Sequence, residues 1–147
     1  MADENGAPAE VRVRSNFVYV INFAAVAVGS TPSGVINIDS AADFLWIKSA
    51  YYADVAGAAQ TDSTRVIPNI DVQIQMGGAD KNLFQGNVPI ASFFGTGQLP
   101  SVLPFPQRLV KSSVLTFTLT SREAAITPRI ALALIGWKDY GTVRRAA

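Results

Sequence analysis

Carboxylates are the side chains in this sequence that could perform chemistry. The 147 residues contain neither histidine nor cysteine, which excludes Ser-His-Asp and Cys-His triads, a thiolate nucleophile and Cys-based zinc sites. A pair of Asp or Glu side chains, the arrangement that glycosidases use, remains open. Most candidates lie in predicted turns or at strand ends, where Asp caps the backbone. We therefore predict that the chain is not an enzyme, with a carboxylate-only glycan hydrolase as the remote alternative. The candidate residues are Asp39, Asp43, Asp54, Asp62, Asp71, Glu123 and Asp139.

Two short patterns could hold a metal or a nucleotide. Asp39 and Asp43 flank a predicted turn and could share a calcium ion, but an oxygen cage needs more ligands than this spacing provides. Gly95 and Gly97 form a G-x-G, yet the third glycine of a dinucleotide fingerprint would fall at Pro100 and no helix follows. We expect no metal and no cofactor.

The charge of the chain is low and evenly distributed. Twelve Lys and Arg residues against eleven Asp and Glu give a net charge of +1, without a basic cluster that would bind nucleic acid. Charged residues make up 16% of the chain, against about 25% in ordinary soluble domains. This composition indicates that part of the surface is hidden in an oligomer. No apolar run reaches the roughly 20 residues of a membrane helix, and no secretory signal is visible, so we expect synthesis in the cytoplasm.

The elements that position these residues are predicted to be strands. Alternation of apolar and polar side chains recurs between turn signals, and no amphipathic helix of more than three turns is convincing. We predict an antiparallel β-sandwich or jelly roll of about seven or eight strands. A single domain over residues 16–140 lies between an N-terminal arm, residues 1–15, and a C-terminal tail, residues 141–147. The main predicted strands cover residues 17–23, 35–38, 43–53, 69–76, 114–120 and 129–137.

Residues 82–109 are strongly apolar but contain three glycines and four prolines. Proline fixes φ and removes a backbone donor, so this segment cannot form a regular helix or a central strand. It either lies over the β core as a lid or contacts another chain. We favour the contact, because aromatic side chains on proline-stiffened loops make interface anchors at low entropic cost. The predicted interface residues are Phe93, Phe94, Leu99, Leu103 and Phe105.

Other candidate binding residues lie near the ends of the chain and in one predicted strand. Arg12, Arg14, Arg144 and Arg145 are either solvated or reach acidic patches on neighbouring subunits. Trp46, Tyr51, Tyr52 and Trp137 could form a platform on which a sugar stacks, although such residues more often fill cores or interfaces.

Three segments, DFLWIKSAYYA, NVPIASFFGTGQLPSVLPFPQRLVKSSVLTFTLTSRE and IALALIGWKDYG, together resemble small virion structural proteins of tailed bacteriophages. The resemblance spans residues 17–141 and implies a capsid decoration or cement protein on the particle surface. It implies a homotrimer that contacts the major capsid protein or other virion proteins, and it offers no catalytic residue. A tail or neck component, or a host-binding protein that recognises glycans, is the alternative.

Overall fold

The chain is built from strands. The computed structural model describes residues 10–55, 67–76, 81–82, 86–96 and 98–144. Within these ranges the prediction of an all-β fold is confirmed. The elements are β1 (Glu10–Phe23), β2 (Ser33–Asn37), β3 (Asp43–Val55), β4 (Ile70–Met76), β5 (Lys81–Asn82), β6 (Val88–Pro89), a short helix α1 (Ile90–Phe93), β7 (Ser101–Leu109), β8 (Val114–Ser121) and β9 (Pro128–Arg144).

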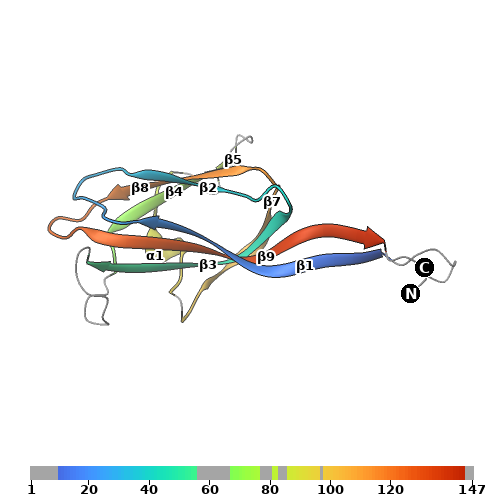
Figure 1. The fold of residues 1–147 in the computed structure, drawn as a ribbon. Coiled ribbons are helices and arrows are strands. Elements are labelled where there is room, and N and C mark those ends of the chain that lie inside the picture. The colour runs from blue at the N-terminus through green and yellow to red at the C-terminus, as the bar shows by residue number, and fades with distance from the viewer. Residues whose placement is uncertain (1–9, 56–66, 77–80, 83–85, 97, 145–147) are drawn as a thin grey trace.

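Two antiparallel sheets pack face to face (Figure 1). The first has the strand order β1-β9-β3-β7, and the second has the order β2-β8-β4-β5 with β6 also paired to β4. The pairs are nested, because β1 pairs with β9, β2 with β8, β3 with β7, and β4 with β5 and β6. A long antiparallel hairpin rolled into two sheets in this way is a jelly roll. The predicted sandwich architecture is therefore confirmed.

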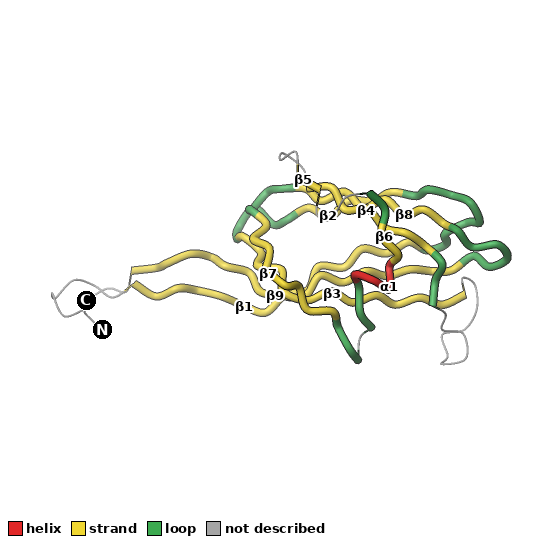
Figure 2. Tube along the Cα trace, turned by 180° about the vertical axis from the view of Figure 1, so that it is seen from behind, coloured by secondary structure: helices red, strands yellow, loops and turns green. Residues whose placement is uncertain are grey.

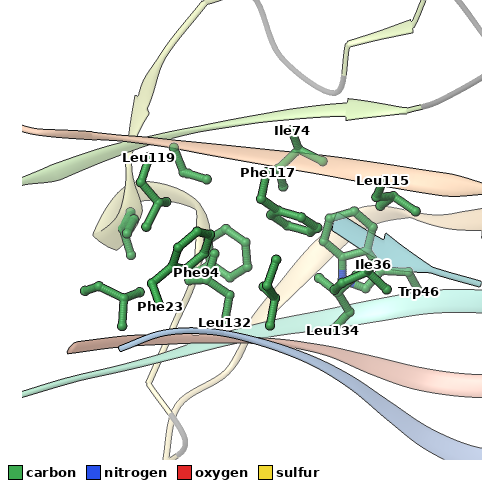
Figure 3. Packing of buried hydrophobic residues seen from close by; sticks show 14 of the residues in the cluster. Phe23, Ile36, Trp46, Ile74, Phe94, Leu115, Phe117, Leu119, Leu132 and Leu134 are labelled. Atoms are coloured by element: carbon green, nitrogen blue, oxygen red, sulfur yellow. The ribbon is translucent and has the colours of Figure 1, made fainter. Parts of the chain in front are cut away.

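Alternating side chains build the core between the sheets. In β8, Leu115, Phe117 and Leu119 are buried while the residues between them are half-buried. Ile130, Leu132 and Leu134 of β9 do the same from the opposite sheet, so the two rows meet face to face (Figure 3). Full burial of one such side chain contributes about 1.5–3 kcal/mol. The alternation of buried and less buried residues, with a period of two, is the signal that predicted the strands.

Trp46 lies in the core between the two sheets (Figure 3). Its indole Nε1 donates hydrogen bonds to the Lys48 carbonyl at 2.9 Å and to Ser49 Oγ at 3.0 Å, so the polar atom is satisfied inside the core. The favoured interpretation of Trp46 as a core residue is confirmed, since its side chain is fully buried, and the alternative of a sugar-stacking platform is wrong for this residue. Tyr51 packs partly buried against the core, and the hydroxyl of Tyr52 donates to Asp54.

The proline-rich segment ends in an edge strand rather than in a continuous loop. β7 pairs with β3 on one side, an edge position that tolerates proline. Trp46 is paired with Gln107 and Lys48 with Val102, so residues 103–106 have no partner in β3. Pro104 and Pro106 fall in this unpaired stretch. The proline rule thus excluded a central strand correctly, but Phe105, which we expected on a proline-stiffened loop, lies in the edge strand β7.

The two ends of the described chain pair with each other beyond the sandwich. Glu10 is paired with Arg144 and Phe23 with Ile130, whereas β3 pairs with β9 no further than Asp139 within the described ranges. Residues 10–13 and 140–144 form a two-stranded terminal ribbon that projects from the body (Figures 1 and 2). The predicted arm and tail therefore need correction for residues 10–15 and 141–144, which are strands. Each segment gains from the other the backbone partners that it lacks alone.

Candidate interaction surface

The terminal ribbon exposes apolar side chains on an element that has no core of its own. Val11, Val13 and Tyr140 retain 38%, 40% and 44% of their accessible surface. Both tube and ribbon views show the ribbon extending past the two sheets (Figure 2). A two-stranded β-ribbon alone in water is marginally stable. The ribbon is therefore an element that gains stability when a second surface covers it.

Asp139 fixes the base of the ribbon. Its side chain is 2% exposed and accepts hydrogen bonds from two arginines. Arg12 of β1 donates from Nε at 3.0 Å and from Nη2, Arg108 of β7 donates from Nη2 at 2.8 Å, and the backbone N–H of Gly141 donates at 3.0 Å. The Arg12 hydrogen bond, followed by that of Arg108, holds the pKa of Asp139 far below its usual range. One carboxylate thus ties β1, β7 and β9 together.

A pocket of about 240 Å³ lies at this junction. Arg108 Nη1 donates to Asp43 Oδ2 at 2.8 Å, and the backbone N–H of Lys111 donates to Asp43 Oδ1 at 2.9 Å. Arg12, Arg108 and Lys111 line the pocket together with Asp43 and Asp139. Both guanidinium groups already bind carboxylates. The ion-paired side chains around the pocket therefore brace the ribbon against the body.

Aromatic and cationic side chains stack beside the junction. Lys138 Nζ lies 3.9 Å from the ring centroid of Phe17 and 3.0 Å from Asp39 Oδ2. The hydrogen bond from Lys138 lowers the pKa of Asp39, and the same bond raises the pKa of Lys138. The guanidinium of Arg14 lies 5.4 Å from the ring centroid of Trp137. Such cation–π pairs add rigidity where β1 and β9 leave the sandwich.

Replacing Asp139 with asparagine should loosen the ribbon. The neutral amide leaves Arg12 and Arg108 without their shared carboxylate, so the base of the ribbon loses charge-assisted hydrogen bonds. We expect faster amide hydrogen exchange over residues 10–14 and a lower midpoint of thermal unfolding. The matched control is Asp71→Asn, which removes the Arg122 ion pair on the other sheet. If both variants changed exchange in the ribbon equally, Asp139 would have no specific role there.

Acid should destabilise the fold through paired carboxylates such as Asp54. Arg129 donates from Nε and Nη2 to Asp54 at 2.9 and 2.6 Å, and this hydrogen bonding lowers the pKa of Asp54. Because the folded pKa lies below the unfolded value of about 3.9, the stabilisation is complete above that value and is lost as pH falls through the folded pKa. Thermal midpoints should be flat above about pH 5 and fall below about pH 4.

The Asp54→Asn variant tests this assignment. Its thermal midpoint should be lower than that of the unaltered chain at pH 7, and the difference should narrow towards pH 2. A constant difference across this pH range would contradict a contribution from the Asp54 carboxylate.

The five apolar residues predicted to form an interface divide between core and surface. Phe94 and Leu103 are buried, so their assignment to an interface is wrong and the lid interpretation holds for them. Phe93 is half-buried, with its ring centroid 5.8 Å from that of Trp46 and 5.1 Å from that of Phe94. Leu99 and Phe105 are 80% and 79% exposed and remain candidates for contact with a partner.

Three of the four arginines predicted to bind neighbouring subunits are described, and all three lie at or near the ribbon. Arg12 and Arg14 are in β1, where Arg12 binds Asp139 of its own chain. Arg144 ends β9, and Arg145 lies outside the described residues. The prediction that Arg12 binds an acidic patch on a neighbouring subunit is therefore corrected: the acidic partner of Arg12 is Asp139 of its own chain.

The candidate catalytic carboxylates are spread over the structure and engaged in ion pairs or backbone hydrogen bonds. Asp39 pairs with Lys138, Asp43 with Arg108, Asp54 with Arg129 and Asp71 with Arg122, while Glu123 accepts from the Asn69 N–H. Asp62 lies outside the described residues. In the described ranges no three Asp or Glu side chains come together as a metal cluster. Gly95 hydrogen bonds with β3 through Tyr51 and Ser49, and Gly97 lies outside the described residues.

Sequence reasoning missed Asp139 as the residue that fixes the base of the ribbon, and it missed the exposed edge of β1. The sequence signal for Asp139 is the charged pair Lys138-Asp139, which interrupts the apolar alternation of β9. In the structure both residues are buried. Its partner Arg12 lies 127 residues away, so no local pattern connects the two.

Comparison with protein-family models gives no match, and neither does comparison with curated proteins. Among solved structures, the fold is similar to a chain in the crystal structure of the infectious bursal disease virus VP2 subviral particle. The sequence identity is 12% and the TM-score is 0.28; the similarity covers 99% of this chain and 39% of that chain. In the described ranges, no helix is long and apolar enough to span a membrane.

Proposed function

We propose that this chain is a non-enzymatic structural protein of a virus particle, which binds the capsid surface and stabilises it by contacting neighbouring capsid subunits. The observation that carries this proposal is the terminal ribbon, a braced element with exposed Val11, Val13 and Tyr140 and no core of its own. Docked on a capsid subunit, the ribbon would bury these side chains and gain the stability that it lacks alone.

The body of the chain suits this role. A jelly roll packs both sheets into one rigid core, and the fold recurs in viral capsid and lectin domains. Because fold alone does not define function, the surface has to distinguish these uses. The proposed glycan platform loses Trp46 to the core, which favours assembly over sugar recognition.

The chemistry of the side chains also favours a structural role. The sequence has no histidine or cysteine, and the carboxylates described above are committed to ion pairs and backbone hydrogen bonds. A catalytic pair needs one carboxyl free to exchange a proton with substrate. The buried Asp139 instead remains charged because two arginines hold its pKa low.

We further propose that the chain acts as a homo-oligomer on the capsid surface. Leu99 and Phe105, both strongly exposed in the proline-rich segment, supply a second apolar contact. Many weak contacts, repeated over a lattice, can stabilise a shell although no single contact is tight.

The proposal is tested on particles of the virus that carries the gene, assembled with and without this chain. Particles that lack it should release their genome at a lower temperature, and the purified chain should restore the resistance. A double variant, Val11→Asp with Val13→Asp, should fail to restore it, whereas Val35→Asp on β2 should succeed. Equal heat resistance with and without the chain would overturn the proposal.

A further inference from the structure

β1 has one paired edge and one open edge. Its hydrogen-bonded neighbour is β9, and β1 is the terminal strand of its sheet. Across the described part of the chain, no other segment forms backbone hydrogen bonds with β1. The open edge therefore presents a row of unpaired N–H and C=O groups, which is a template for another strand.

The other sheet edges are protected, whereas residues 15–23 of β1 are not. β7 carries Pro104 and Pro106, β2 has five residues, and β5 and β6 have two residues each. Proline and short length are devices that prevent edge-to-edge pairing. β1 has 14 residues, with neither proline nor glycine, and residues 15–23 (SNFVYVINF) carry no charge. A long uncharged edge of this kind fits a strand that is paired in the assembled state.

Residues 16–22 of β1 are nearly palindromic, with the sequence NFVYVIN centred on Tyr19. We propose that β1 pairs antiparallel with β1 of a second copy across a two-fold axis at Tyr19. This register sets Asn16 opposite Asn22, Phe17 opposite Ile21, and Val18 opposite Val20. Amide meets amide and apolar side chain meets apolar side chain, so the strand is complementary to itself, as an isologous contact requires.

The faces of the strand are compatible with this pairing. Ile21 and Phe23 are buried towards the core, whereas Val18, Val20 and Asn22 are exposed on the outer face. Residues directly opposite each other in an antiparallel pair share a face. Val18 and Val20 are 46% and 51% exposed, and in this register Val18 of one copy covers Val20 of the other.

Charge does not oppose the contact. Arg14 lies five residues before the two-fold axis, so the two copies of Arg14 would be separated by ten residues along the strand, roughly 33 Å. This distance exceeds the screening length of about 8 Å at physiological ionic strength.

Sizing of the full chain by light scattering and sedimentation tests the contact. The unaltered protein should show a dimer that dissociates on dilution. Val20→Lys should abolish that dimer, because it places two lysines about two residues apart across the axis and lysine blocks edge pairing. Val35→Lys on β2, a valine of similar exposure, should leave it intact. A chain that stays monomeric at all concentrations, or equal loss in both variants, would overturn the proposal.

Disulfide trapping tests the register, and the absence of cysteine from the chain makes it specific. Asn16→Cys and Asn22→Cys are prepared separately, since both side chains are exposed. The proposed register sets residue 16 of one copy opposite residue 22 of the other, whereas the two copies of residue 16 lie roughly 20 Å apart. An equimolar mixture should therefore form a cross-linked dimer under mild oxidation, and each variant alone should not.

Cross-linking of each variant alone to the same extent as the mixture would overturn the two-fold register. The contact does not depend on the proposed capsid role, because both tests use the isolated chain. Failure of the capsid experiment would leave the dimer standing, and failure of the dimer would leave ribbon binding to capsids standing.

Discussion

Replacing Gly136 with alanine should prevent the chain from forming a stable fold. Gly136 of β9 lies opposite Trp46, next to the register shift between Trp46 and Lys48 in β3. A Cβ at this position would overlap the Leu45 carbonyl oxygen and lie 2.9 Å from its carbonyl carbon. The obstacle is backbone in the centre of a sheet, so neither strand can yield without breaking its pairing with the other.

The expected loss exceeds that of ordinary overpacking, which costs about 1–3 kcal/mol. We expect Gly136→Ala to lower the free energy of unfolding by more than about 3 kcal/mol, the upper limit of that range, or to leave the chain unfolded. The matched control is Gly34→Ala, where the new Cβ would meet the end of the flexible Ile21 side chain at 2.7 Å. Chemical denaturation of the two variants measures the difference, and equal stability would contradict the close approach of β9 to β3.

Replacing Phe94 with alanine should cost about 3–5 kcal/mol of unfolding free energy. Phe94 is 1% exposed and follows α1, from which its side chain enters the space between the sheets (Figure 3). Truncation removes a buried ring and leaves a cavity. The neighbouring Phe93 and Trp46 cannot fill this cavity while α1 and β3 keep their positions. Urea unfolding gives the change in free energy directly.

Phe105→Ala provides the comparison within the same segment. Phe105 is 79% exposed in the unpaired stretch of β7, so its truncation should change the stability of the isolated chain by less than about 0.5 kcal/mol. Similar losses in the two variants would contradict the division of this segment into a core part and a surface part.

Strands with regular alternation could be predicted from sequence. The predicted strands at residues 43–53 and 114–120 match β3 (Asp43–Val55) and β8 (Val114–Ser121) to within two residues. In β8 every second side chain is buried, so side-chain period and backbone conformation have the same cause. In β3 the alternation of burial ends after Trp46, where the pairing register shifts. The prediction at residues 129–137 missed the end of β9, because residues 138–144 lack apolar alternation although they pair with β1.

The proline-rich segment could not be resolved in this way. Phe94 and Phe105 occur in similar apolar surroundings, and neither lies in a periodic stretch, so the sequence holds no sign of which one faces inward. The placement of Phe94 depends on tertiary contacts, namely the hydrogen bonds of the adjacent Gly95 with Ser49 and Tyr51. The ribbon was missed for a related reason, since its ion pair joins Arg12 and Asp139 across 127 residues.

Direct imaging of assembled particles tests the central claim, which is that the chain binds a virus shell through its ribbon. Electron cryomicroscopy of particles carrying the chain should reveal jelly-roll density on the shell, with residues 10–13 and 140–144 lying against a neighbouring capsid subunit. Particles without that density, or density in which the ribbon points into solvent, would contradict the account.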